Sequence, residues 1–338
     1  MQHSVAKLDE SPRRAALRLV STKDLPRQEW LDVRKTGIGS SDAAAAVGLN
    51  PYCSPLELWL NKTNREAKSD ASLDTATSED DASPMYWGTL LEPIVASHYT
   101  RKTGNRVRRI NAVLQHPNPE LPWMLANIDR EVVGCPDVQI LECKTAGING
   151  VRLWADGVPQ YVQLQVMHQL AVTGKQAADV AVLVCGQELR VHRIERDEAM
   201  IAHLIQLEKR FWHHVQTDTP PPADGSDSSG QALRHLFPRD TGTVVDFTAD
   251  RELCAAYADW VSLREVLDRQ EALEASLAQR MQQAMGEATQ ATFETGSVRW
   301  KKVADSAVLD TARLLKDDPT LLQRYGKVRN GPRRFTQV

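Results

Sequence analysis

The sequence predicts an α/β or α+β core with a mixed central sheet flanked by helices, followed by a mainly helical C-terminal region. Three observations support this prediction. Between residues 86 and 194, helical apolar spacing alternates with short strand-like runs. A Pro- and Ser-rich stretch at residues 217–230 then interrupts the pattern. Beyond it, residues 250–286 are rich in Ala, Leu, Glu and Gln, with apolar residues at helical intervals.

Each element of the core has a local signal. The helices show apolar side chains three and four residues apart and end at Gly104 and Gly174, since glycine favours a helix terminus. The strands are short runs rich in β-branched and other apolar residues. The expected elements are a helix over 86–103, strands over 106–115, 123–132 and 138–145, a helix over 159–173, and strands over 179–185 and 189–194.

Composition shifts divide the chain into four parts. They are an N-terminal extension (1–25), a core (26–216) with a flexible insertion rich in Ser, Asp and Thr (64–84), a linker (217–230) and a mainly helical C-terminal region (231–338). The apolar residues at helical intervals in 250–286 would form a stripe on one helix face. This stripe is explained by packing within the chain or by a contact between subunits. We favour packing within the chain slightly.

The composition excludes several classes of protein. The net charge of −3 excludes a binder that holds nucleic acid by overall positive charge, so any such contact must use local basic patches. The five cysteines include no C-x-x-C pair, which argues against a disulfide framework, a zinc site or an iron–sulfur cluster. No apolar run is long enough to span a bilayer, and the first residues lack the apolar centre of a secretory signal. We therefore expect a cytoplasmic protein without a membrane partner.

The segment LECKT at residues 141–145 carries the strongest chemical signal. Side chains two apart on a strand point to one face, so Glu142 and Lys144 project together. Hydrolysis of a phosphodiester needs a hard cation held by oxygen ligands and a positioned water. Glu142 could hold the cation, and Lys144 could orient the water or stabilise charge.

A metal site of this kind needs a second acid. Asp137 lies five residues before Glu142, which places the two on opposite faces of a strand and about 16 Å apart at roughly 3.3 Å per residue. Asp137 is therefore expected in the turn after Gly134. Asp129, near the end of the preceding strand, would come beside Glu142 if the two strands are antiparallel neighbours, so we expect it to be the second ligand. Glu92, on an otherwise apolar helix, is about equally well explained as a third acid or as a solvated helix residue.

Two residues on the helix at 159–173 are candidate site residues. Tyr161 and Gln165 are four apart and share one helix face. Gln165 could hold a water or contact phosphate. Taken alone, the pair is better explained as ordinary polar helix residues.

A glycine-bearing loop after Arg34 is a candidate anion site. The loop ends at Ser40 or Ser41, which we expect to cap a short helix that runs to Val47. Backbone N–H groups at a helix start, a serine hydroxyl and a nearby arginine suit a phosphate. Taken alone, this signal is weak, because capped loops are common.

Five segments occur in one order between about residues 34 and 174: RKTGIGSSDAAAAVGLNPYCSPLELWLNKT, WGTLLEPIVASHY, ANIDR, LECKT and QVMHQLAVTG. Together they resemble the YqaJ-like viral recombinase family, whose best-known member is the phage lambda exonuclease. The resemblance implies a PD-(D/E)xK nuclease fold and a toroidal homotrimer that degrades one strand of linear double-stranded DNA from its 5′ end. It also implies two Mg²⁺ ions with Mn²⁺ as an alternative, a phage single-strand annealing protein as partner, and a phage or prophage origin in a bacterial cytoplasm.

The resemblance also assigns roles to individual residues. It implies that Asp129 and Glu142 bind metal together with the Cys143 backbone carbonyl, and that Glu92 is the helical acid near the metal. It also implies that Lys144 is the catalytic lysine and that Gln165 lies beside the reacting phosphate. The residues implied to contact the terminal 5′-phosphate or the DNA are Arg34, Ser40, Ser41 and Tyr161. Where the lambda enzyme has a further acid, this chain has Pro119 and Glu120, which leaves the role of Glu120 open. The C-terminal helical region has no close counterpart in that enzyme.

Two other functions compete with an exonuclease. An endonuclease of the restriction or repair type would use the same metal chemistry, and the pocket at Arg34 is the feature that separates the two. A DNA-binding module without catalysis would use the basic clusters at residues 101–109 and 325–335. The acids and the lysine favour a nuclease over such a module.

Overall fold

The computed structural model describes residues 15–65, 84–327, 331 and 333–337. It divides into two compact units, Met1–Pro238 and Arg239–Val338. The expected insertion at residues 64–84 lies almost wholly outside the described residues, as do residues 1–14 of the expected N-terminal extension.

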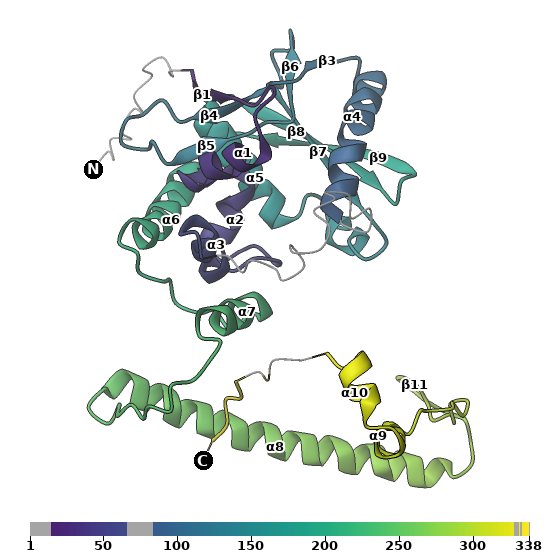
Figure 1. The fold of residues 1–338 in the computed structure, drawn as a ribbon. Coiled ribbons are helices and arrows are strands. Elements are labelled where there is room, and N and C mark those ends of the chain that lie inside the picture. Colours follow the sequence, from purple (N-terminus) through teal and green to yellow (C-terminus); the bar gives the residue numbers. More distant parts are fainter. Residues whose placement is uncertain (1–14, 66–83, 328–330, 332, 338) are drawn as a thin grey trace, which may run out of the picture. The chain divides into compact units, whose positions relative to one another are not determined.

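The first unit contains both strands and helices (Figure 1). In chain order they are β1 (Leu17–Ser21), α1 (Arg27–Lys35), β2 (Ile38–Gly39), a 3₁₀ turn (Ser40–Asp42), α2 (Ala43–Ala46), α3 (Pro55–Lys62), α4 (Pro84–Thr103), β3 (Arg106–Arg108), β4 (Ala112–Gln115), β5 (Met124–Ala126), β6 (Arg130–Val133), β7 (Ile140–Ala146), a 3₁₀ turn (Val151–Trp154), α5 (Gln160–Thr173), β8 (Ala177–Val184), β9 (Glu188–Glu195), α6 (Glu198–Gln216) and α7 (Asp227–Leu236).

The strands of this unit form two sheets. The larger has the order β3-β6-β7-β8-β9, in which β7 and β8 are parallel and the other neighbours are antiparallel. The smaller has the order β1-β4-β5-β2, with β2 parallel to β5. The predicted α+β class with a mixed sheet flanked by helices is therefore confirmed.

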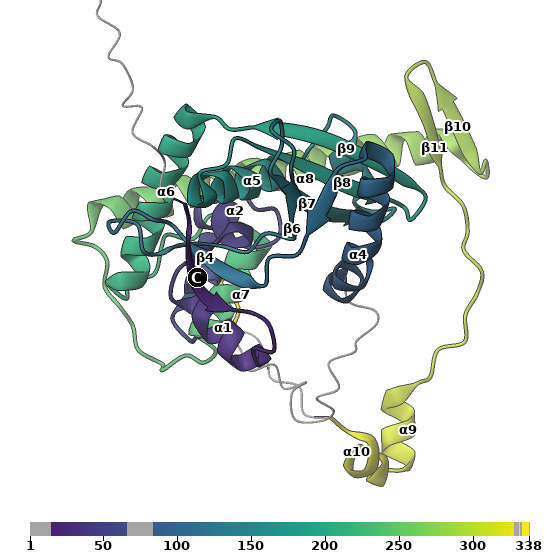
Figure 2. The same ribbon diagram turned by 90° about the horizontal axis from the view of Figure 1, so that it is seen from above.

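Two helices cover opposite faces of the larger sheet. Helix α5 links the parallel strands β7 and β8, and Figure 2 shows it on the side of these strands opposite to α4. Side chains alternate accordingly: Ile140 belongs to the buried cluster that contains the α5 side chains Val162 and Leu170, whereas Leu141 belongs to the cluster that contains Tyr99 of α4. Glu142 and Lys144 follow Ile140 at intervals of two, so the fold directs both toward α5.

Two of the expected strands are each divided between the sheets. The run at 106–115 contributes β3 to the larger sheet and β4 to the smaller one. The run at 123–132 contributes β5 to the smaller sheet and β6 to the larger one. The expectation of one continuous strand over 106–115 and one over 123–132 is thus corrected. The polar residues Asn111 and Asn127 lie at the two breaks, where the chain leaves one sheet for the other.

Helix α7 extends the first compact unit beyond the expected linker at residues 217–230. The Ser54 backbone N–H donates to Ser228 Oγ at 2.7 Å, and the Ser228 hydroxyl also donates to the Glu57 carboxylate. These bonds attach the start of α7 to α3. The boundary between the units consequently lies after Pro238, later than the linker predicted from composition.

The second unit is built on one long helix. Helix α8 (Arg251–Met285) confirms the helix expected over 250–286, and it is followed by the hairpin β10 (Gln290–Phe293) and β11 (Gly296–Arg299) and by helices α9 (Thr311–Asp317) and α10 (Thr320–Tyr325). The hairpin was not expected. In the described part of the chain, no helix is both long and apolar enough to cross a bilayer.

A buried histidine joins β5, α5 and α6. His168 Nδ1 lies 2.7 Å from Glu208 Oε1, and its Nε2 lies 2.9 Å from the Leu125 carbonyl oxygen. Both His168 and Glu208 are fully buried. Burial alone would lower the pKa of His168, but the Glu208 charge and the two acceptors outweigh burial and raise that pKa above its usual value.

This pair predicts a pH dependence of stability. Because the folded-state pKa of His168 is raised, its stabilising contribution is complete below the unfolded-state pKa of about 6.5 and is lost as pH rises through the folded value. We expect His168→Gln to lower the free energy of unfolding by about 3 kcal/mol near pH 6 and by progressively less at higher pH. Urea unfolding between about pH 6 and pH 9 measures this difference, with the exposed His213→Gln as the matched control. A difference that does not change with pH would contradict the charged pair.

Candidate active site

The acid and the lysine of β7 meet on one face of the strand, as their spacing predicts. Lys144 Nζ lies 2.8 Å from Glu142 Oε1. The Glu142 residue is only 2% exposed, whereas 26% of the Lys144 side chain is exposed. The lysine therefore provides the solvent-facing edge of a largely buried ion pair.

Two glutamines of α5 complete the surroundings of Glu142. Gln165 Nε2 donates to Glu142 Oε1 at 2.6 Å, and Gln165 Oε1 accepts from Lys144 Nζ at 2.9 Å. Gln169 Nε2 donates to Glu142 Oε2 at 2.7 Å. Sequence reasoning identified Gln165 but missed Gln169, although its position four residues later, on the same helix face, was an available signal.

Asp129 lies beside Glu142, but it is in the bend before β6 and not within a strand. Its Oδ2 accepts a hydrogen bond of 2.8 Å from the Cys143 backbone N–H. Burial and the nearby Glu142 charge raise the pKa of Asp129 far above its usual value, and the Cys143 hydrogen bond offsets this only in part. The antiparallel pairing of β6 with β7 thus brings the two carboxylates together, as predicted.

Glu92 of α4 lies near this pair but is engaged by arginines. Its carboxylate accepts from Arg130 and, at 3.3 Å, from Arg109. Its charge still contributes to the raised pKa of Asp129. Among the described residues, no three His, Cys, Asp or Glu side chains form a ready metal cluster.

The carboxylates fit a hard cation in their chemistry. Asp129 and Glu142 supply oxygen ligands, the type that Mg²⁺ prefers. Their mutual repulsion in a buried setting is the charge imbalance that a cation would relieve. Cys143, whose backbone N–H donates to Asp129, also carries the backbone carbonyl oxygen that the family resemblance implies as a metal ligand.

Two tyrosines form an edge-to-face pair next to α5. The ring centroids of Tyr52 and Tyr161 are 5.9 Å apart, with an interplanar angle of 87°. Burial raises the pKa of Tyr161, and the Lys144 charge opposes this rise. Tyr52 is 65% exposed, so the pair presents an aromatic edge to solvent near the lysine.

The loop after α1 holds Arg34 as a directed cation. Arg34 Nη2 donates to Ser41 Oγ at 3.0 Å and to Asp42 Oδ1 at 2.7 Å, and its guanidinium lies 4.9 Å from the centroid of the Trp30 ring. Gly37 permits the close approach of this loop to β5, because a Cβ there would lie 2.3 Å from the Trp123 carbonyl oxygen.

The expected serine cap is wrong. Neither Ser40 nor Ser41 caps the short helix. Gly39 is the N-cap of the preceding 3₁₀ turn, where Asp42 Oδ2 accepts from the Gly39 N–H at 3.1 Å, and α2 itself has no side-chain cap. Ser40 is buried and donates to the Asn127 carbonyl at 3.4 Å, whereas Ser41 is exposed beside Arg34.

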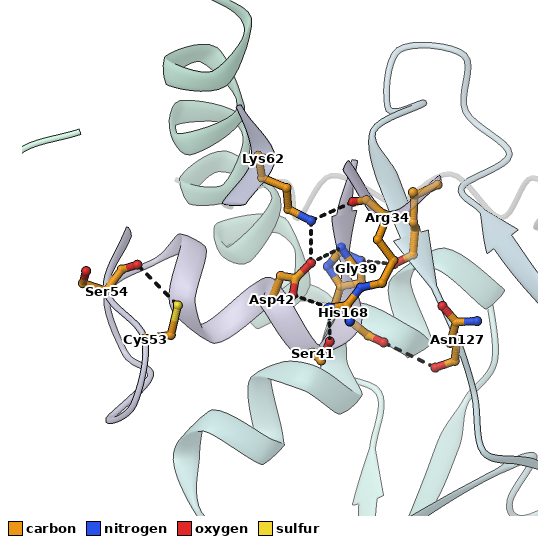
Figure 3. A network of polar contacts seen from close by, with 11 residues as sticks. Arg34, Gly39, Ser41, Asp42, Cys53, Ser54, Lys62, Asn127 and His168 are labelled. Carbon is orange, nitrogen blue, oxygen red and sulfur yellow. Dashed lines mark hydrogen bonds and ion pairs between the residues drawn. The ribbon is translucent and has the colours of Figure 1, made fainter. Parts of the chain in front are cut away.

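Asp42 is the centre of a charge network that sequence reasoning did not detect. Lys62 Nζ of α3 donates to Asp42 Oδ2 at 2.6 Å and to the Arg34 carbonyl at 2.8 Å. Figure 3 shows Lys62 and Arg34 on either side of the Asp42 carboxylate. Burial alone would raise the pKa of Asp42, but the two cations outweigh burial and lower it. One carboxylate thus faces two cations, which leaves one positive charge in excess at Arg34.

One backbone carbonyl connects this loop to the buried carboxylates. The Asn127 oxygen accepts from Ser40 Oγ at 3.4 Å and from Gln169 Nε2 at 3.2 Å. Gln169 in turn donates to Glu142. The cationic loop and the acid pair are therefore two parts of one hydrogen-bonded site.

Two other acids lie outside this site. Asp137 is in the bend between β6 and β7, as predicted, where its carbonyl accepts from Arg193 at 3.1 Å. Glu120 is exposed in the turn before β5, whereas Asp129 follows the end of that strand. Glu120 and Asp129 consequently lie at opposite ends of β5.

Several known sequences and solved structures are similar to this chain. The model of the YqaJ-like viral recombinase domain matches residues 29–176. The uncharacterized protein YqaJ of Bacillus subtilis (strain 168) is 32% identical over 315 residues, which cover 91% of this chain and 93% of that protein. Among solved structures, an alkaline exonuclease (LHK-Exo) from Laribacter hongkongensis is 22% identical with a TM-score of 0.45, covering 56% of this chain and 93% of its own. A phage-related exonuclease from Haemophilus somnus 129PT is 11% identical with a TM-score of 0.37, covering 56% and 99%.

The repulsion between the buried acids predicts a stabilising substitution. Because the folded-state pKa of Asp129 is raised, stability falls as pH rises from the unfolded value of about 3.9 through the folded value. Asp129→Asn removes this penalty and keeps an acceptor for the Cys143 N–H. In EDTA near pH 9 we expect the variant to be more stable than the wild type by about 1–3 kcal/mol, measured by thermal or urea unfolding. Asp137→Asn, in the bend outside the site, is the control and should show no such gain. A loss of stability in Asp129→Asn would contradict the proposed repulsion.

Proposed function

The chain belongs to the YqaJ-like viral recombinase family, and from this premise we propose that it is a metal-dependent 5′-to-3′ exonuclease acting on linear double-stranded DNA. The family membership confirms the resemblance expected from the five sequence motifs. The observation that carries the proposal is the hydrogen-bonded link between an acid–lysine centre and a cationic loop through the Asn127 carbonyl. An exonuclease needs such a combination, because it must hold a chain end at a set distance from the bond that it cuts.

Asp129, Glu142 and the Cys143 carbonyl would hold Mg²⁺, and we propose two such ions, with Glu92 as the third acid. When bound, Mg²⁺ supplies positive charge that neutralises the reacting phosphate. Mn²⁺ has the same preference for oxygen ligands and is a candidate substitute. Glu92 is held near Asp129 by its contacts with Arg130 and Arg109.

Lys144 and Gln165 are the groups that would handle the attacking water. Lys144 is a donor at the exposed edge of the buried pair, so it can orient a water molecule or stabilise negative charge on the phosphate. Gln165 contacts both Lys144 and Glu142, which restrains the ammonium group in that position. Tyr161, on the same helix, would contact the DNA strand.

Arg34 and Ser41 would bind the terminal 5′-phosphate, whereas the buried Ser40, which donates to the Asn127 carbonyl, would hold the loop in place. Asp42 and Trp30 orient the Arg34 guanidinium, and Ser41 adds an exposed hydroxyl beside it. The excess positive charge of this loop favours a phosphate dianion over an uncharged 5′-hydroxyl. End polarity in the proposal follows from this pocket.

The proposed product is a duplex with 3′ single-stranded tails, used in phage-type DNA recombination by strand annealing. A single-strand annealing protein is the proposed partner, and a toroidal homotrimer around the duplex is the proposed assembly. We place this activity in the cytoplasm of a bacterial host. These parts of the proposal rest on the family and not on the geometry of the site.

The proposal predicts the loss of cleavage without the loss of DNA binding. Asp129→Ala and Glu142→Ala should reduce hydrolysis by about 10³-fold or more, because each removes a group that acts together with the others. The assay uses a linear duplex labelled separately at each 5′ and 3′ end, with Mg²⁺ or with EDTA, next to a closed circular duplex.

Asp137→Ala is the matched control and should retain full activity. Mg²⁺-dependent release that starts at 5′ ends, with the circle intact, is the expected result. Cutting of the circle would instead favour an endonuclease, and binding without any cutting would favour a non-catalytic DNA-binding module.

A second prediction concerns the end pocket. Arg34→Ala should reduce the preference for 5′-phosphate over 5′-hydroxyl ends by about 10- to 100-fold, the loss expected for charge-assisted hydrogen bonds worth ~1.5–3 kcal/mol. Digestion rates of the two duplexes by the wild type, Arg34→Ala and Arg27→Ala measure this preference. Arg27 lies exposed at the start of the same helix and should not affect it. An unchanged preference in Arg34→Ala would remove this residue from the pocket.

A further inference from the structure

Helix α8 is long and is only partly covered within its own unit, where the Trp260 ring contacts Phe335 with centroids 5.4 Å apart. It begins after Asp250, whose side chain accepts from the Glu252 and Leu253 N–H groups, and it runs for 35 residues to Met285. None of these 35 residues is buried. Most helices in proteins owe their stability to the packing of one apolar face, so this helix lacks its usual source of stability within the described chain.

An apolar stripe runs along α8 with a seven-residue repeat. Leu263 is 61% exposed and Leu267 is 56% exposed, although both lie in the middle of the stripe. This spacing is typical of helices that pair as coiled coils. The large apolar residues at the two core positions of the repeat are Leu253, Trp260, Leu263, Leu267, Leu277 and Met281.

We propose that α8 pairs with α8 of a second copy of this chain in an antiparallel, two-fold symmetric coiled coil. The register that covers the stripe along its whole length places Leu253 opposite Ala284 of the second copy, and Trp260 opposite Leu277. This inference is independent of the proposed function, because it uses no residue of the candidate active site.

The charges beside the stripe complement one another in this register. Asp259 faces Arg280 of the second copy, and Arg264 faces Glu271, so symmetry creates four pairs of opposite charge. All four side chains belong to exposed residues, and within the described chain none of them forms an ion pair. The uncharged flanking positions also match, because Val266 faces Leu273.

A parallel pair would be less favourable. It would place Glu274 against its own copy at a core position, where like charges repel. In the antiparallel register, Glu274 faces Leu263 and lies next to Arg264 of the second copy. The direction of pairing therefore follows from the charges, whereas the stripe alone leaves it open.

An apolar groove at the end of α8 fits the same partner. Leu277, Met281 and Met285 form it together with Phe293 of the hairpin. The antiparallel register brings Leu253 of the second copy to this groove, with Tyr257 one turn further along. The second copy thus covers both the stripe and the groove with its own α8.

The mass of the full-length protein in solution tests the pairing. Leu267→Glu should halve the mass measured by light scattering or sedimentation, whether the wild type contains two chains or a larger even number. Ala272→Glu introduces the same side chain on the opposite face of α8 and should leave the mass unchanged. Circular dichroism verifies that both variants are folded. An unchanged mass in Leu267→Glu would overturn the proposal.

Charge reversal tests the direction of pairing. Asp259→Arg and Arg280→Asp should each weaken association by about tenfold or more, because each turns two attractive pairs into repulsive ones. The double variant D259R/R280D should recover wild-type association. Recovery by D259R/R264D instead would indicate a parallel pair and would overturn the antiparallel arrangement.

Discussion

Burial of the Glu142 carboxylate is the constraint on which the rest of the site depends, because a charge removed from water costs several kcal/mol unless it is paired and hydrogen bonded. Lys144 provides the opposite charge, and Gln165 and Gln169 provide amide donors to both oxygens. These partners come from two elements, so β7 and α5 must pack in one register for the charge to be tolerated. The same requirement makes the site rigid: neither the strand nor the helix can shift without leaving a buried carboxylate unpaired.

The passage of the chain from one sheet to the other places the remaining groups of the site. Asn127 and Asp129 both lie in the short connection between β5 and β6, which belong to different sheets. At such a break, backbone groups are released from the ladder and can bind side chains. The Asn127 carbonyl accepts from Ser40 and Gln169, and the Asp129 carboxylate reaches the backbone of β7. A continuous strand here would use these backbone groups for pairing with its neighbours. The break between β5 and β6, which the sequence pattern did not reveal, therefore allows the loop of Arg34 to be hydrogen bonded to the part of the site that contains the acids.

Residues of the site were predictable where the argument stayed within one element or one strand pair. Alternation along β7 was enough to place Glu142 and Lys144 on one face and to exclude Asp137. The network around Asp42 was not predictable, because its cations come from α1 and α3 and no periodic pattern relates them. The serine cap failed for a related reason: the Ser40 hydroxyl donates to the Asn127 carbonyl and the Ser41 oxygen accepts from Arg34, and only the folded chain brings these partners to the two serines.

The sequence by itself determined the class of fold, most of the helices, the faces of β7, the family, and the apolar stripe of α8. The helices, the faces of β7 and the apolar stripe depend on hydrogen bonds and side-chain spacing within a few residues of each other. The family follows from five short motifs. Each of these features can therefore be recognised in short stretches of the sequence. Tertiary structure decided how the strand runs at 106–115 and 123–132 divide between two sheets, which cations surround Asp42, and how Asn127 joins the two halves of the site. Such contacts require distant segments to meet in one geometry, and that geometry is set by the simultaneous packing of all the elements and by no local pattern.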